Sequence, residues 1–108
     1  MLFHITELTT WQEAQGQGVY QAKSLASEGF IHLSQADQVV ATGNRFYKGQ
    51  LGLVLLGIDE ARLESELRYE KVSDHGTFPH LYGPLNIEAV VQVRDFIPQA
   101  DGTFAMPG

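Results

Sequence analysis

The sequence predicts one α+β domain, built as a small, curved, mostly antiparallel sheet with two helices. The apolar run 51–58 is long and uninterrupted by charge, which is typical of a central strand covered on both faces. Two stretches have helical spacing, one around Trp11 and one over 34–47. Shorter candidate strands lie at 2–6, 19–22, 30–34, 67–72 and 87–93.

Length and composition are those of a single globular domain. A chain of 108 residues, 44% hydrophobic and 19% charged, has the size and composition of one globular domain. We expect residues 1–108 to form a single domain with a core over 2–97. The segment 98–108 is expected to be a frayed tail.

Charge and motif content exclude several classes of protein. The net charge of -6 argues against a nucleic-acid partner and against an anionic membrane surface. The chain has no cysteine, and its first residues lack the basic and apolar regions of a signal peptide. No run reaches membrane-spanning length. A cytoplasmic location is therefore expected.

The first strand, 2–6, is expected to present two faces. Alternation puts His4 and Thr6 on one face and Phe3 and Ile5 on the other. His4 is thus a histidine within an apolar run, with Thr6 beside it. Its simpler interpretation is a histidine at the edge of the core, bonded to a backbone carbonyl.

Two capping boxes are expected to start the helices. Thr10 with Glu13 would open the helix that carries Trp11. Ser34 with Asp37 would open the second helix, directly after the strand 30–34. The N-terminus of that second helix would offer free backbone N–H groups to an anion such as phosphate or carboxylate.

The middle of the chain is expected to contain a short helical turn and a strand. Segment 24–28 would form one turn closed by Gly29. In the strand 30–34, His32 and Ser34 would share one face, away from the core. The segment 73–86 contains several prolines and glycines and is predicted to be a structured loop.

Histidines in apolar surroundings are the strongest indication of a functional site. Segments 30–34 and 78–84 each place one imidazole, His32 and His80, among apolar residues, and His4 is in a similar setting. Burying an imidazole is costly unless its nitrogens find partners. Three such histidines together predict one shared polar pocket, although each alone is compatible with a structural role.

Other side chains could complete such a site. The predicted loop 76–84 is stiffened by its prolines and carries Tyr82 as well as His80, which suits either a binding loop or a plain connector. Arg45 could hold an anion, and Glu70 or Glu88 could act as a general base. Surface positions are the alternative for each of them.

The segments described so far resemble the domain-of-unknown-function family 952 along nearly the whole chain, 2–97. The resemblance lies in segments 3–6 and 28–34, the Trp11 helix and segment 78–84. This family is in turn similar to the ADP-ribosyltransferase-like fold. The first strand resembles the His-Gly-Thr strand of poly(ADP-ribose) polymerases and RNA 2′-phosphotransferases.

The second resemblance implies roles for individual residues. By similarity, His4 and Thr6 would hold a ribose of NAD, and His32, Ser34 and Arg45 would hold phosphate or ribose oxygens. Further roles follow for four other side chains. Tyr20 would stack on nicotinamide, Glu88 would be the catalytic acid of the last strand, and His80 and Tyr82 would close the same cleft in a manner particular to the family.

Three functions follow as expectations. The first is an ADP-ribosyltransferase-like protein that binds or transforms NAD or an ADP-ribose derivative, with His32, His80 and Glu88 as catalytic candidates. The second is a non-catalytic module that binds a nucleotide or a small anion. The third is a metal-dependent hydrolase that uses His4, His32 and His80, although their spacing lacks the usual metal-site pattern.

Overall fold

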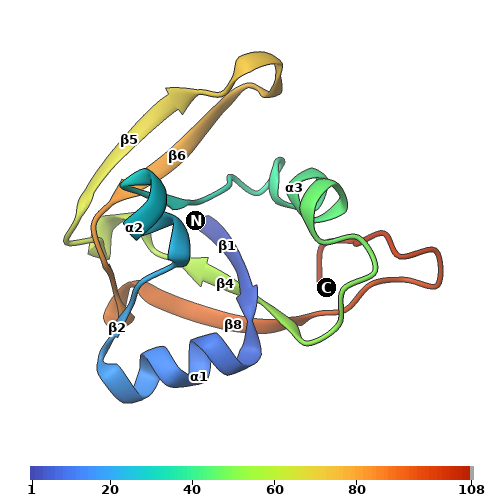
Figure 1. Ribbon diagram of the computed structural model, residues 1–108, viewed down its shortest axis with the longest axis horizontal. Helices are drawn as coiled ribbons and strands as arrows, with labels where there is room; N and C mark the ends of the chain where they lie inside the picture. The colour runs from blue at the N-terminus through green and yellow to red at the C-terminus, as the bar shows by residue number, and fades with distance from the viewer. Residues whose placement is uncertain (108) are drawn as a thin grey trace.

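The computed structural model describes residues 1–107. Figure 1 shows how its helices and strands are arranged. The α-helices are α1 (Leu8–Gln17), α2 (Lys23–Glu28) and α3 (Val39–Phe46). The strands are β1 (Leu2–Glu7), β2 (Val19–Tyr20), β3 (Ile31–His32), β4 (Leu53–Ile58), β5 (Glu66–Lys71), β6 (Thr77–Tyr82), β7 (Leu85–Asn86) and β8 (Val90–Phe96). Short 3-10 turns are η1 (Glu60–Arg62), η2 (Ser73–His75) and η3 (Ile87–Ala89).

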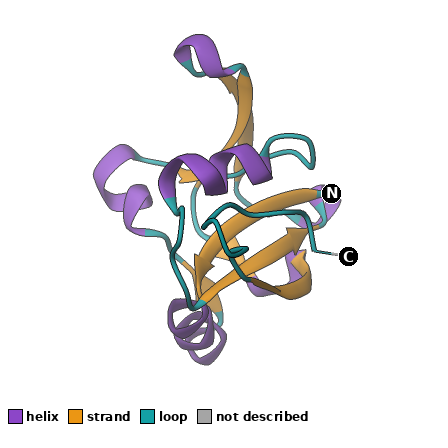
Figure 2. Ribbon diagram, turned by 90° about the vertical axis from the view of Figure 1, so that its right-hand side faces the viewer, coloured by secondary structure: helices purple, strands orange, loops and turns teal. Residues whose placement is uncertain are grey.

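The α+β class is confirmed, but the strands form three small antiparallel sheets rather than one. There are three α-helices rather than two, because the predicted turn at 24–28 is a helix, α2. Their strand orders are β1-β4-β8, β3-β6-β5 and β2-β7. A single bridge joins the first two sheets, since Phe3 and Ser34 exchange both backbone hydrogen bonds at 2.8 Å. The β5–β6 hairpin extends away from the β1-β4-β8 sheet and carries η2 at its tip (Figures 1 and 2).

Strand β4 is central, as predicted, and all six of its residues are buried. Its alternate side chains serve two separate apolar clusters. Leu56 belongs to the cluster that contains Trp11, whereas Leu55 belongs to the cluster that contains Phe96. A strand covered on both faces needs no polar side, which is why its sequence reads as a continuous apolar run.

Neither predicted capping box forms. Helix α1 begins at Leu8, directly after β1, and no side chain caps it. Its start is fixed instead by the sheet, because the Leu8 N–H donates to the Gly52 carbonyl at 2.8 Å. Helix α3 begins at Val39, since the backbone of Ser34 is already paired with Phe3. The predicted anion site at a helix N-terminus beside Ser34 is therefore wrong.

The segment 73–86, predicted to be a loop, contains η2 and strands β6 and β7. Strand β6 pairs with β3 on one side and β5 on the other. Pro79 is tolerated there because of its position. The Pro79 carbonyl faces β3, because it accepts a hydrogen bond from the Leu33 N–H at 3.0 Å. The nitrogen of Pro79 points to the same side, so the missing N–H falls where the pairing of β6 with β3 ends. The pairing with β5 loses no hydrogen bond.

The tail expected to fray instead returns to the core. Phe104 is buried and stacks on Phe96, with ring centroids 4.3 Å apart and planes 4° from parallel. Its N–H donates to the Asn44 side chain at 2.7 Å. Gly43 permits this packing, because a Cβ there would stand 2.9 Å from the Phe96 ring.

The helices of this fold are short. Within residues 1–107 none is long and apolar enough to cross a lipid bilayer.

Candidate functional site

A cleft of about 660 Å³ opens beside β1, β3 and β6 and is flanked by α2 and α3. Small-molecule sites commonly enclose roughly 300–1,000 Å³, so the cleft has the size of a ligand site. It brings together seven of the side chains singled out in the sequence: His4, Thr6, Tyr20, His32, Ser34, Arg45 and His80.

His4 lies at the floor of the cleft and has both ring nitrogens occupied. Nδ1 lies 2.7 Å from the His32 carbonyl oxygen, and Nε2 lies 2.8 Å from the Tyr20 hydroxyl. Burial lowers the pKa of His4 to about 4, so the ring is neutral at pH 7. Because a carbonyl only accepts, Nδ1 carries the proton and Nε2 accepts from Tyr20.

This arrangement gives His4 a structural role. The Tyr20 oxygen is also 3.0 Å from the Thr6 hydroxyl, so the network ties β1 to both β2 and β3. His4 thus bonds to a backbone carbonyl, as its simpler interpretation supposed, and offers no free nitrogen to a ribose. Tyr20 is only 3% exposed and contacts the Trp11 and His4 rings, which leaves little of its face for stacking.

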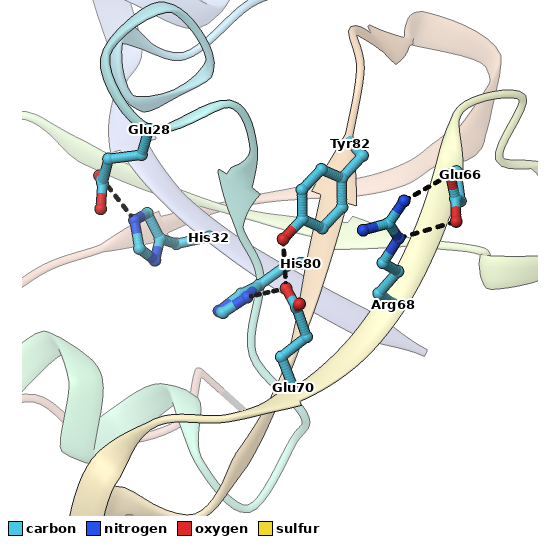
Figure 3. A network of polar contacts seen from close by, with 7 residues as sticks. All are labelled: Glu28, His32, Glu66, Arg68, Glu70, His80 and Tyr82. Carbon is cyan, nitrogen blue, oxygen red and sulfur yellow. Dashed lines mark hydrogen bonds and ion pairs between the residues drawn. The ribbon is translucent and has the colours of Figure 1, made fainter.

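A second network surrounds His80 (Figure 3). His80 Nδ1 donates to Glu70 Oε1 at 2.9 Å, and the Tyr82 hydroxyl donates to the same oxygen at 2.5 Å. The hydrogen bond from Tyr82, followed by that from His80, lowers the pKa of Glu70. The same bond raises the pKa of Tyr82. Glu70 is therefore ionised and fixes the orientation of His80.

His32 lies directly across from His80, since the two are register partners on β3 and β6. Their ring centroids are 5.5 Å apart. His32 Nε2 lies 2.9 Å from Glu28 Oε2, so this imidazole also has a carboxylate partner. Phe30 packs against both imidazoles, stacked on His80 at 4.1 Å and edge-on to His32 at 4.8 Å.

Cations and hydroxyls occupy the α2 and α3 sides of the cleft. Lys23 and Arg45 line it, and within residues 1–107 neither forms an ion pair. Ser34 lies with its hydroxyl 3.4 Å from that of Thr42. Unneutralised cations beside hydroxyl groups are suited to bind an anionic group.

Two of the predicted site residues lie outside the lining of the cleft. Tyr82 acts on it indirectly, through Glu70 and His80. Glu88 was predicted to lie on a strand, but it is exposed on the 3-10 turn η3, and its backbone carbonyl lies at the Arg62 side chain. Strand β8 begins only at Val90, so nothing directs the Glu88 carboxylate into the cleft.

The sequence interpretation missed Glu28, Lys23, Thr42 and Phe30 as parts of the site. Glu28 precedes His32 by four residues, and that spacing was the available signal. It was hidden because Gly29 ends helix α2 with a left-handed turn at φ 90°, which brings a helix residue back against the following strand.

The three-histidine metal site is not assembled. Among residues 1–107 no group of three histidine or acidic side chains lies close enough to hold a metal ion. Both ring nitrogens of His4 form hydrogen bonds to protein groups, whereas a histidine that binds a metal needs one nitrogen free.

Comparison with known proteins places this architecture in a family. A family model described as "Protein of unknown function (DUF952)" matches residues 5–93. The chain belongs to the DUF952 family. The resemblance predicted from the sequence is thereby confirmed at the family level. A search of curated proteins gave no match.

Solved structures similar to this DUF952 chain come from Caulobacter crescentus protein CC0527. The crystal structure of CC0527 shares 32% sequence identity with this chain and has a TM-score of 0.89. The match covers 96% of this chain and 92% of the CC0527 chain. The solution NMR structure of CC0527 shares 33% sequence identity and has a TM-score of 0.82. The match covers 94% of this chain and 89% of the CC0527 chain. The α+β fold described above is therefore shared with an experimentally determined relative.

Proposed function

We propose that the cleft binds NAD or an ADP-ribose derivative, in a fold of the ADP-ribosyltransferase-like type. One observation carries the proposal. The residues selected by the resemblance to ADP-ribosyltransferases come from β1, β2, the segment that contains β3, and α3, and six of them line one cleft. A concave pocket in which polar side chains from separate segments converge is the usual starting point for a site hypothesis.

The lining of the cleft holds two cations, Lys23 and Arg45, and two carboxylates, Glu7 and Glu28. The two cations and the hydroxyl groups support an anionic, nucleotide-like ligand. Within residues 1–107 Lys23 and Arg45 form no ion pair, although the net charge of the protein is -6, and the Arg45 guanidinium lies over the Phe46 ring at 4.8 Å. A diphosphate would place its negative charge near them, and charge-assisted hydrogen bonds to phosphate are among the stronger ones in proteins. Ser34 and Thr42 add hydroxyl groups to the lining, and the Thr42 hydroxyl also donates to the Gln38 carbonyl at 3.2 Å.

The aromatic groups support the same class of ligand. The imidazole rings of His32 and His80 line the cleft, and Phe30 stacks on the His80 ring from behind the lining. Planar bases gain from stacking against such rings. The resemblance assigned a ribose of NAD to His4 and Thr6, but both ring nitrogens of His4 are bonded to protein groups. In this proposal Ser34 and Thr42 hold that ribose instead.

Calorimetric titration with ADP-ribose and NAD tests the proposal. We expect Arg45→Gln to weaken ADP-ribose binding roughly 10- to 100-fold, since one charged hydrogen bond to phosphate is worth about 1.5–3 kcal/mol. Arg62→Gln is the matched control, because it removes the same charge from the η1 turn, where Arg62 pairs with Asp59. Equal loss in both variants, or no binding by the unmodified protein, would contradict the proposal.

A non-catalytic binding module is the second candidate. It is favoured by the position of Glu88, because the carboxylate expected for transferase chemistry lies outside the cleft. Recovery of NAD unchanged after long incubation, together with measurable binding, supports this candidate. Release of nicotinamide supports the transferase alternative.

A further inference from the structure

Two imidazoles, each held by its own carboxylate, face one another at the cleft. His32 and His80 are register partners with ring centroids 5.5 Å apart. Glu28 lies 2.9 Å from His32 Nε2, and Glu70 lies 2.9 Å from His80 Nδ1. Figure 3 shows the two rings lying between their two carboxylates. The arrangement is therefore a pair of His–Glu dyads.

Each ring keeps one nitrogen for chemistry. His80 Nε2 has no protein partner, and among residues 1–107 no fully buried side-chain nitrogen or oxygen lacks one. Nε2 is therefore in contact with solvent on the cleft side, although the His80 side chain is only 6% exposed. His32 is half exposed and bonds to Glu28 through Nε2, so its Nδ1 is available.

We infer that His32 and His80 form an acid–base pair that hydrolyses a cyclic phosphodiester on the ribose of a nucleotide. An acid and a base whose free nitrogens both reach one bound group are what this reaction requires. Lys23 and Arg45 supply positive charge for the phosphate. The inference rests on the proposed function, since the cleft must first bind a nucleotide.

The reaction balances with water as the sole co-reactant. A water oxygen attacks phosphorus, and His80 Nε2 accepts the proton that the water loses. The bond between phosphorus and one ribose oxygen breaks, and protonated His32 gives its Nδ1 proton to that oxygen. The product is a ribose phosphomonoester with a neighbouring free hydroxyl. Solvent then returns the proton from His80 to His32, which restores the starting state.

The surroundings of His80 favour its assignment as the base. Because Glu70 is an ionised acceptor at Nδ1, the neutral ring keeps its proton there and presents the Nε2 lone pair to the cleft. Tyr82 holds the Glu70 carboxylate, and Phe30 holds the ring by stacking. Glu70 and Tyr82 are thus positioning residues for His80.

Hydrolysis of 2′,3′-cyclic AMP by the untagged protein, followed by separation of the monophosphate products, tests the inference. We expect His80→Ala, His80→Gln and His32→Ala each to lower kcat by about 100-fold or more. Glu70→Gln should lower kcat at an unchanged KM, as expected for a group that orients the base without touching the substrate. Glu13→Gln, at an exposed position of α1 outside the cleft lining, is the matched control and should keep full activity.

The outcomes separate this inference from the proposed function. Binding of ADP-ribose without turnover of the cyclic phosphate overturns the acid–base pair and leaves the proposed function standing. Turnover that persists in the His32→Ala and His80→Gln variants also overturns it. If both histidine variants abolish turnover, the acid–base pair of His32 and His80 is supported. This holds even if ADP-ribose fails to bind, because that result contradicts only the proposed ligand.

Discussion

Acidification from pH 7 to pH 4 is expected to lower the free energy of unfolding by about 3 kcal/mol through His4 alone. Burial lowers the pKa of folded His4 to about 4, whereas a histidine in an unfolded chain titrates near 6.5. Between these values the unfolded chain binds more protons, so stability falls as the pH falls. The difference between these two pKa values corresponds to roughly 3 kcal/mol.

Urea unfolding at several pH values between 7 and 4.5 measures this effect. We expect His4→Gln to flatten the dependence of the unfolding free energy on pH over this range. His75→Gln is the matched control, because His75 is exposed on η2 and should leave the slope unchanged. An identical slope for His4→Gln and the unmodified protein would show that His4 does not stay neutral in the folded state.

Replacing Phe104 by alanine is expected to destabilise the protein by about 3–5 kcal/mol. Phe104 is 4% exposed and stacks on Phe96, so its removal leaves a cavity against α3 that the neighbouring rings cannot fill. Total stabilities of small domains are about 5–15 kcal/mol, which makes this a large fraction of the whole.

Denaturant unfolding of the Phe104→Ala variant measures the loss. Ile97→Ala is the control in the same segment, because Ile97 is 68% exposed and its truncation should change stability by less than about 0.5 kcal/mol. Similar midpoints for the two variants would mean that the tail adds nothing to the core. In that case the expectation of a frayed tail would be restored.

The fold was most predictable where one element carried its own pattern. Strand β4 could be identified from its continuous apolar run, and the two faces of β1 followed from alternation, with Ile5 directed to the cluster of Phe96 and His4 directed away from it. Helix α2 and its closing Gly29 were also correctly predicted. Each of these features depends on residues a few positions apart.

The prediction failed where a distant partner changed the role of a residue. Ser34 has the sequence signature of a helix cap, but its backbone is committed to Phe3. Pro79 is typical of a loop, yet it lies in β6 because its missing N–H falls where pairing with β3 ends. Phe104 follows a proline and a glycine, and nothing near it in sequence indicates that Phe96 and Gly43 receive it.

The candidate site divides in the same way. The residue types available to the site are evident from the chain alone: histidines in apolar segments, a hydroxyl beside two of them, and few cations. Their roles depend on contacts that form only when distant segments pack together. Partners from other strands make His4 a buried, neutral residue that connects three strands, and Glu70 fixes the orientation of His80. Burial and hydrogen-bond partners set the pKa and the orientation of an imidazole, and these partners lie up to 28 residues away along the chain.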